Sequence, residues 1–283
     1  MTETLEAPVV EAAPKPKPSI ASLAGSVVVG GLRTAGDIVN FSKSVLKEFG
    51  DVRLYATEVI YQAGTLILTS GLIIWVMQGV MGTVCGLEAS YTLKQIGAPL
   101  YSGIFNAFCS LREMSPYMWG YIFAAKVGCG LVAELGSMRI SDEIDALEVM
   151  GIRSKAYLVG TRILAAWLAI PFLYTVGLAV MYITMYLVTV VQLGGVSPGG
   201  YLYIFWLYQN PLDFLFSQIK VMSYGTAVVF IGCYYGFNAS GGPVGVGKAT
   251  AKSMMISMVL IHIIGVLLTQ LFWGLNPNAP IAN

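Results

Sequence analysis

Four long stretches of the chain contain no Asp, Glu, Lys or Arg, and they limit its fold more than any other feature. They cover residues 59–87, 163–212, 221–247 and 253–283. A helix needs roughly 20 residues to cross a hydrocarbon core about 30 Å thick, so each stretch is long enough to cross one. Strands of a membrane barrel would alternate polar and apolar residues, and these stretches do not. The sequence therefore predicts an all-α polytopic membrane protein.

Composition excludes several other classes of protein. Hydrophobic residues make up 56% of the 283 residues and charged residues 11%, whereas about a quarter of a soluble domain is charged. The formal net charge of +1 gives no sign of a nucleic-acid partner. Four cysteines stand singly in apolar stretches, and the single histidine, His262, lies within an apolar stretch as well. We therefore expect no metal site, and we interpret His262 as a buried packing residue.

The chain divides into a polar tail, an amphipathic segment and five crossings. Residues 1–19 are rich in Pro, Glu and Lys, which predicts a disordered cytoplasmic tail. Apolar positions recur at near-helical spacing in residues 20–50, which predicts a helix lying in the membrane interface. Residues 97–111 are apolar but rather short to span. The expected crossings are about 60–84, 116–135, 163–191, 212–237 and 254–273.

The positions of Lys and Arg predict which side of the membrane each connection faces. With five crossings, the basic segments before the first crossing, between the second and third, and between the fourth and fifth all fall on one side. The opposite side holds only Lys94 and Arg112. A sixth crossing at 97–111 would place most of the basic segments outside. We therefore expect the N-terminus in the cytoplasm, with the C-terminus and the tail 276–283 outside.

A charged segment between the second and third crossings predicts a short cytoplasmic helix, about residues 141–151. Ser141 is a favourable N-cap, Asp142 and Glu143 complement the positive end of a helix, and Gly151 can end it. Three acidic side chains share one side at i, i+3 spacing: Asp142, Asp145 and Glu148. Three apolar side chains lie away from them: Ile144, Leu147 and Met150. Periodicity alone leaves two interpretations open, a helix that docks on a soluble partner and a solvated loop helix.

Two short motifs match enzyme signatures without the context that those signatures need. Residues 242–248 read G-P-V-G-V-G-K and nearly complete a phosphate-binding loop, but Ala249 replaces the required Ser or Thr. A membrane crossing, rather than a strand, precedes them, so we expect a glycine-rich cytoplasmic turn. Residues 195–199 read G-V-S-P-G, but neither a strand nor a histidine-acid pair accompanies this serine. The chain is therefore not expected to be an enzyme.

Two longer segments carry a resemblance to a known family. Residues 133–152 read A-E-L-G-S-M-R-I-S-D-E-I-D-A-L-E-V-M-G-I, and residues 233–247 read C-Y-Y-G-F-N-A-S-G-G-P-V-G-V-G. Both resemble hallmarks of the MlaE/YrbE permease family, and S-L-R-E at 110–113 adds to the likeness, which extends over about residues 50–275. The second segment looks most like the B-type subunit of actinobacterial, including mycobacterial, Mce systems.

The resemblance implies a dimerising permease domain over residues 51–275, with N-terminus in, C-terminus out. Its implied partners are a cytoplasmic ABC-type ATPase, which would bind ATP and Mg²⁺ in place of this chain, a paralogous A-type permease, and Mce-domain lipid-binding proteins outside. The implied cargo is a hydrophobic lipid that is imported, such as a fatty acid, mycolic acid, sterol or phospholipid. The ATPase would contact the coupling helix: Arg139, Asp142, Glu143, Asp145, Leu147, Glu148 and Gly151.

Other functions remain open from the sequence. The chain could also be a non-transporting scaffold for Mce proteins, or a secondary transporter that works without ATP. Charges inside the membrane are costly and usually face a bundle interior or a cavity. They either line the lipid path or form structural ion pairs, and the set is Arg112, Glu113, Lys126, Glu134, Asp213 and Lys220. Asp213 and Lys220 are seven residues apart and share a helix face, but two turns separate them.

Overall fold

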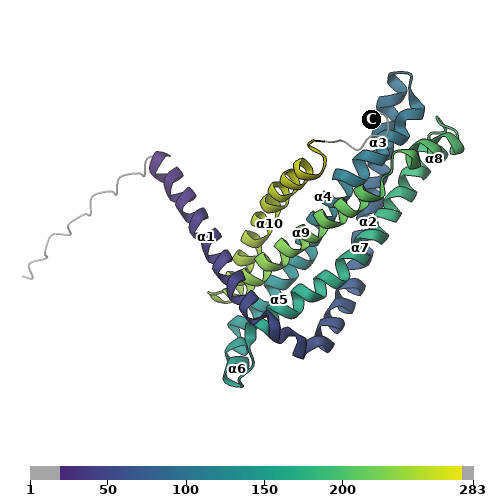
Figure 1. The fold of residues 1–283 in the computed structure, drawn as a ribbon. Helices are drawn as coiled ribbons and strands as arrows, with labels where there is room; N and C mark the ends of the chain where they lie inside the picture. The colour runs from purple at the N-terminus through teal and green to yellow at the C-terminus, as the bar shows by residue number, and fades with distance from the viewer. Residues whose placement is uncertain (1–19, 276–283) are drawn as a thin grey trace, which may run out of the picture. The chain divides into compact units, whose positions relative to one another are not determined.

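The computed structural model describes residues 20–275 and divides the chain into two compact units, Met1–Asn40 and Phe41–Asn283 (Figure 1). The described part of the first unit is helical and forms most of α1 (Ile20–Glu48). The predicted tails, 1–19 and 276–283, lie outside the described residues. The position of the 20–50 segment at the membrane interface stays a prediction, although its helical conformation is as expected.

Five helical stretches among the described residues are long and apolar enough to cross a membrane, which confirms the predicted fold class. Their bounds are Gly36–Gln95, Pro99–Ile140, Lys155–Gln192, Pro211–Phe237 and Gly242–Trp273. The α-helices within them are α2 (Ala56–Gln95), α3 (Ser102–Cys109), α4 (Ser115–Phe123), α5 (Cys129–Ile140), α7 (Thr161–Tyr186), α9 (Pro211–Phe237) and α10 (Gly242–Trp273). Two helices are too short to span: α6 (Glu143–Val149) and α8 (Pro198–Leu207).

The helical stretch that contains the second crossing is longer than the predicted crossing, 116–135. Residues 99–111 belong to the same stretch, which ends at Ile140. Helices α3, α4 and α5 follow one another through two π-helical turns, Ser110–Met114 and Ala124–Gly128. The helix continues through Arg112 and Glu113 because both side chains find charged partners, as described below. Residues 97–111 therefore form no separate sixth helix of spanning length, as expected, and residues 99–111 are continuous with the helical stretch of the second crossing.

The helix of the fifth crossing begins before the predicted crossing, 254–273, and the expected glycine-rich turn at 242–248 is wrong. Those residues form the first two turns of α10, and the chain reverses just before them, at 238–241. Pro243 lies in the first turn of α10, where its missing N–H costs nothing because that group would have no helical partner. The glycines of this segment therefore lie in a helix instead of a phosphate-binding loop.

Helices α2 and α7 approach closely because glycines of α2 face the backbone of α7. A Cβ atom at Gly82 would lie 2.4 Å from the carbonyl oxygen of Met181. A Cβ atom at Gly86 would lie 3.2 Å from the carbonyl oxygen of Met185. Small residues allow membrane helices to pack backbone to backbone in this way. The interior between the helices is filled by large side chains that are fully buried, among them Trp119, Phe123, Tyr174 and Tyr224.

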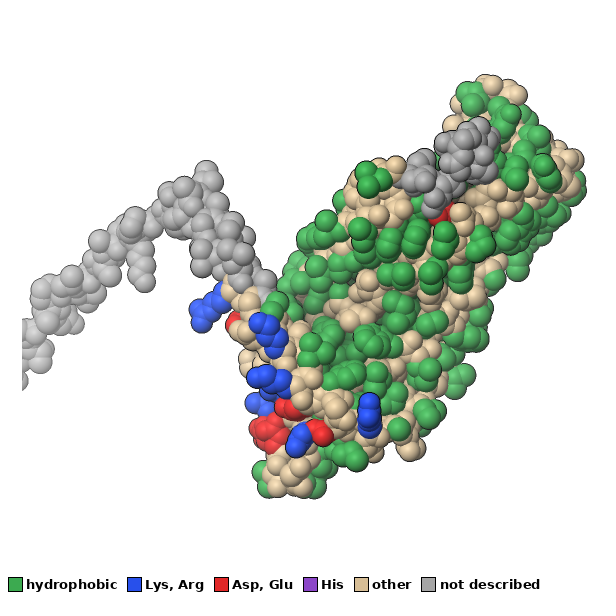
Figure 2. Space-filling model, viewed as in Figure 1, with side chains coloured by type: hydrophobic (Ala, Val, Ile, Leu, Met, Phe, Trp, Pro, Cys, Tyr) green, Lys and Arg blue, Asp and Glu red, His purple; other side chains and the backbone are tan. Residues whose placement is uncertain are grey.

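Charged side chains gather at the end of the bundle that carries α6. In Figure 1, α6 extends beyond α5 at one end, and α3 and α8 lie at the other. Figure 2 shows hydrophobic side chains over most of the same face, while most of the visible Lys, Arg, Asp and Glu side chains lie near the α6 end. Because Lys and Arg concentrate on the cytoplasmic side of membrane proteins, we expect the α6 end to face the cytoplasm.

Candidate functional site

Helix α6 is attached to the bundle by one buried side chain and one ion pair. Ile144 is fully buried and joins the main core cluster, with Leu147 packed beside it. Arg139, at the end of α5, contacts Asp145 at 2.5 Å. This pair is exposed, so its contribution to stability is about 1 kcal/mol or less. The apolar contact of Ile144, more than the ion pair, therefore holds α6 against the bundle.

The sequence predicted the C-terminal end of α6 correctly, but not the residue that begins the helix. Ser141 is not the N-cap, because its hydroxyl donates back to the carbonyl of Ser137 in α5. The position before the helix is Asp142, whose φ of 57° makes the sharp turn out of α5. Gly151 ends the helix as predicted, with a φ of 78°. The amides of Gly151 and Ile152 donate to the carbonyls of Glu148 and Leu147, which is a Schellman motif.

Most of the predicted coupling residues have partners within this hairpin, and its exposed surface carries both acidic and apolar side chains. Glu148 accepts a hydrogen bond from the Ser154 hydroxyl at 2.5 Å, and Glu143 contacts the Ser141 hydroxyl at 2.8 Å. The four acidic side chains are exposed, whereas Leu147 is half-buried; the acidic residues are Asp142, Glu143, Asp145 and Glu148. Val149 is 88% exposed and Met150 66% exposed. These two side chains form the apolar tip of α6, and the prediction did not include them among the site residues.

A buried ion pair joins the second crossing to α9. Arg112 donates two hydrogen bonds to Asp213, from Nε at 3.0 Å and from Nη2 at 2.7 Å. The second carboxylate oxygen of Asp213 accepts from the indole Nε1 of Trp273 at 2.8 Å. Asp213 is 1% exposed. The guanidinium of Arg112 also lies over the ring of Phe108, 4.2 Å from its centroid.

A second pair lies beside the first. Lys220 has a fully buried side chain and contacts Glu113 at 3.1 Å. Its ammonium also donates to the carbonyl of Arg112 at 2.7 Å and to the hydroxyl of Thr269 at 2.9 Å. Asp213 and Lys220 therefore do not pair with each other, and each finds its partner in the Ser110–Met114 turn. The four charges cancel within one cluster.

An open pocket adjoins these charges, and we call it the aromatic pocket. Its volume is about 710 Å³, which lies within the usual range for small-molecule sites. It is lined by Leu93, Tyr101, Ile104, Phe105, Phe108, Cys109, Arg112, Glu113, Thr269 and Trp273. Glu113 keeps 37% of its side chain exposed although Lys220 is buried. The pocket thus offers a long apolar wall with two charged groups at one place, which suits an amphipathic molecule.

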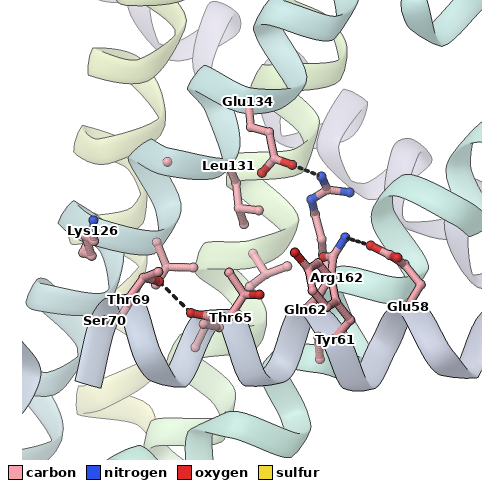
Figure 3. A pocket seen from close by; sticks show the side chains of 15 residues that line it. Glu58, Tyr61, Gln62, Thr65, Thr69, Ser70, Lys126, Leu131, Glu134 and Arg162 are labelled. Atoms are coloured by element: carbon pink, nitrogen blue, oxygen red, sulfur yellow. Dashed lines mark hydrogen bonds and ion pairs between the residues drawn. The ribbon is translucent and has the colours of Figure 1, made fainter. Parts of the chain in front are cut away.

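The remaining predicted charges, Lys126 and Glu134, line a different cavity, the polar pocket, of about 350 Å³ (Figure 3). Helix α2 lies along one side of it, and the other lining residues come from the Ala124–Gly128 turn, α5, the start of α7 and Val229 of α9. Glu134 contacts Arg162 of α7 at 2.5 Å. Lys126 lies apart from that pair, at the other end of the pocket. Among the residues that the structure describes, Lys126 has neither an ion-pair nor a hydrogen-bond partner.

Sequence reasoning missed several members of both pockets. Trp273 and Thr269 were not considered because their partners come from far along the chain. Arg162 was counted only as a basic connecting residue, although its side chain is 6% exposed. One signal was available, since Glu58, Gln62, Thr65 and Thr69 recur every three or four residues and so share one face of α2. All four line the polar pocket.

The prediction that His262 is buried is wrong. Its side chain is exposed on α10, and its ring Nε2 hydrogen-bonds the hydroxyl of Tyr121 at 2.7 Å. The other ring nitrogen contacts the carbonyl of Met258, 2.9 Å away on the preceding turn of α10. Both ring nitrogens thus have partners within the helices, which allows this polar side chain to lie on the outer face of a spanning helix.

Comparison with known proteins identifies the family. Residues 59–271 match the family model described as Permease MlaE. A probable ABC transporter permease protein of Rickettsia bellii is 30% identical over 68% of this chain and 74% of its own. Another, from Rickettsia prowazekii, is 28% identical over 90% of this chain and 98% of its own. The chloroplastic protein TRIGALACTOSYLDIACYLGLYCEROL 1 of Arabidopsis thaliana is 30% identical over 57% of this chain and 46% of its own. The chain therefore belongs to the MlaE permease family of ABC transporter permeases and is a multi-pass protein of the bacterial inner membrane.

Proposed function

We propose that this chain is the membrane-spanning subunit of an ATP-driven lipid transporter, and that a separate cytoplasmic ATPase binds ATP and Mg²⁺ and drives it through α6. The observation that carries this proposal is the construction of α6. Its core side, Ile144, is buried, its end is fixed by the Gly151 turn, and its apolar tip is left uncovered. Exposed apolar side chains on a rigid support are typical of a protein-protein contact.

The aromatic pocket supports a lipid as the cargo. An acyl chain needs an extended apolar wall, and the head of a lipid needs polar groups at one end of it. The pocket has both, because Phe105 and Phe108 belong to its apolar wall while Arg112 and Glu113 supply charge. The name of the Arabidopsis relative also refers to a glycerolipid. Fatty acids, mycolic acids, sterols and phospholipids all fit this description, and the direction we propose is import.

The finer assignment concerns partners. We infer an A-type paralogue as the second permease and Mce-domain proteins on the outer side, in a heteromeric complex of the kind found in mycobacteria. This assignment as a B-type subunit rests on the resemblance of residues 233–247 to that subunit. The relatives described above carry the broader name of ABC transporter permease, so the Mce partners are the part of the proposal that needs direct isolation.

The test is affinity isolation of the tagged chain from its native membrane in a mild detergent, followed by mass spectrometry of the bound proteins and lipids. The test variants are Val149→Glu and Met150→Glu, since neither side chain supports the fold. Val244→Glu is the matched control, because Val244 is 71% exposed at the start of α10 and is not part of α6. Wild type and control should recover an ABC ATPase, whereas the two α6 variants should lose it and lose lipid uptake.

Two results would contradict the proposal. Equal recovery of the ATPase with all variants would show that α6 is not its docking site. Recovery of lipid-binding proteins with wild type but of no ATPase, even after mild cross-linking, would instead indicate a scaffold without transport. Substituting Asp145 and Glu148 by Lys gives a weaker test, because Asp145 pairs with Arg139 and Glu148 with Ser154 inside the hairpin.

A further inference from the structure

The polar pocket contains charges that the rest of the protein does not neutralise. Arg162 and Glu134 form one pair, and Glu58 accepts a hydrogen bond from the neutral amide of Gln62 at 2.8 Å. Lys126 has no partner among the described residues. Arg162 is more than nine-tenths buried, yet its Nε atom is also without a hydrogen-bond acceptor in the structure. Lys126 is thus the positive charge of this pocket that is both exposed and without a partner among the described residues, and it is available to a bound group.

Lys126 lies within the predicted second crossing, 116–135. The end of α5, at Ile140, is 14 helical residues further along the chain, or about 21 Å along the axis. A lysine side chain extends only about 6 Å, so the Lys126 ammonium stays close to the polar pocket that it lines. An exposed ammonium at this depth is costly in hydrocarbon and needs a polar occupant beside it.

The opposite wall of the pocket, formed by α2, also presents polar groups to a bound molecule. Thr65 and Thr69 of α2 are exposed, and their hydroxyls lie on the polar face that begins with Glu58 and Gln62. The Thr69 hydroxyl donates back to the carbonyl of Thr65 at 2.8 Å, so its oxygen can still accept. Apolar side chains follow on the same helix, since Leu68 is 84% and Leu72 73% exposed. Polar and apolar binding surfaces therefore adjoin each other.

We propose that the polar pocket binds the headgroup of a lipid from the membrane half next to α6, with the phosphate or carboxylate of that headgroup on Lys126. The inference rests on the proposed lipid transport and adds a second lipid site to the aromatic pocket. Glu113 and Lys126 are separated by 13 residues of nearly continuous helix, or about 20 Å. The two pockets therefore lie at different depths of the same spanning stretch.

The test measures lipid binding directly, without ATP or transport. The full chain in lipid nanodiscs is irradiated with phosphatidylglycerol or palmitate that carries a diazirine next to the headgroup, and the labelled peptides are identified by mass spectrometry. A neutral diacylglycerol with the same diazirine serves as the uncharged probe. We expect the anionic probes to label peptides that contain residues 58–70 and 126–134.

The variants test whether labelling depends on the charge of the Lys126 side chain or only on its size. Lys126→Gln should lower labelling of these peptides by about tenfold, because a charge-assisted contact is lost, and Lys126→Arg should restore it. Lys252→Gln is the matched control, since Lys252 is an exposed lysine of α10 outside the pocket, and it should change nothing. Glu58→Gln should increase labelling, because it removes a negative charge from the same pocket. The expected effect of Glu58→Gln on labelling is opposite in sign to that of Lys126→Gln. It can be measured even if the Lys126→Gln variant does not fold.

Four outcomes would overturn the proposal: unchanged labelling in Lys126→Gln, equal labelling by the neutral probe, loss of labelling in excess inorganic phosphate, or cross-links between the pocket and a second copy of the chain. The third would indicate a soluble anion, and the fourth a permease-permease contact. Failure of the proposed function gives a different result, because loss of the ATPase from wild-type membranes would leave this labelling intact. Conversely, normal ATP-driven uptake without labelling would refute the headgroup site alone.

Discussion

Removing the carboxylate of Asp213 is expected to destabilise the protein more than removing the whole ion pair. Asp213 is 1% exposed and accepts three hydrogen bonds, two from Arg112 and one from Trp273. Asp213→Leu would leave the Arg112 charge, 13% exposed, without a counterion, which costs about 3–5 kcal/mol. Arg112→Met leaves a buried carboxylate unpaired and should cost a similar amount.

In the double variant, Arg112→Met with Asp213→Leu, no unpaired charge remains. The indole N–H of Trp273 still loses its acceptor, at a cost of about 1–3 kcal/mol. The double variant should therefore be more stable than either single variant. The assay is the free energy of unfolding of each variant in detergent, combined as a double-mutant cycle.

The exposed pair Arg139–Asp145 provides the control cycle, with the same substitutions, and its coupling should be about 1 kcal/mol or less. The reasoning would be refuted if the effects at Arg112 and Asp213 were additive. Additivity would mean that the two charges are hydrated independently in the membrane-embedded protein and do not neutralise each other.

Three further predictions follow from single contacts. Gly82→Ala should cost about 1–3 kcal/mol of unfolding free energy through overpacking against α7, whereas Gly64→Ala, which has open space around its Cβ position, should cost nothing in the same assay. Gly151→Val should cost about 1–2 kcal/mol, because φ is positive there, and hydrogen exchange of the Ile152 amide should become faster. Glu134→Gln should lower lipid uptake while ATPase recovery in the affinity isolation stays unchanged; loss of the ATPase as well would contradict it.

The class of fold and the number of crossings could be predicted because both depend on local composition. Uncharged stretches of sufficient length identify a membrane helix wherever they occur, and four of the five crossings contain one. The second crossing was the exception, and the helical stretch that contains it begins well before the predicted start at 116. Arg112 and Glu113 lower the hydropathy of that segment, and their neutralisation by Asp213 and Lys220 depends on residues about 100 positions away. No local pattern contains that information.

The N-cap prediction also failed, at a residue that lies between the end of one helix and the start of the next. Ser141 has the side chain of an N-cap, but its hydroxyl bonds back to α5, and the turn instead uses Asp142 in a left-handed conformation. The role of Gly151 was predicted correctly because the turn requires a positive φ, which glycine adopts easily and few other residues do. The apolar tip, Val149 and Met150, was not assigned to the docking surface, since the acidic stripe was the more regular pattern.

The π-helical turns could not be predicted, and they place the charges of the second crossing. Each turn holds one residue more than an α-helical turn, so the side chains on either side of it change register. The first turn contains Arg112 and Glu113, and the second contains Lys126. Such turns occur frequently at functional sites. The charged side chains of the aromatic pocket and Lys126 of the polar pocket thus lie at irregular positions of one otherwise continuous helix.

The polar pocket is the part of the membrane domain that α6 reaches most directly. Helix α5 enters the α6 hairpin, and α7 leaves it, and Glu134 of α5 is bonded to Arg162 of α7 beside the pocket. A force on α6 that separates these two helices would stretch this ion pair. Its separation would free both charges into the pocket that contains Lys126, and would change the affinity of the proposed site for an anionic headgroup. If the ATPase docks on α6 as proposed, a displacement there would therefore alter lipid binding without a hinge inside the spanning helices.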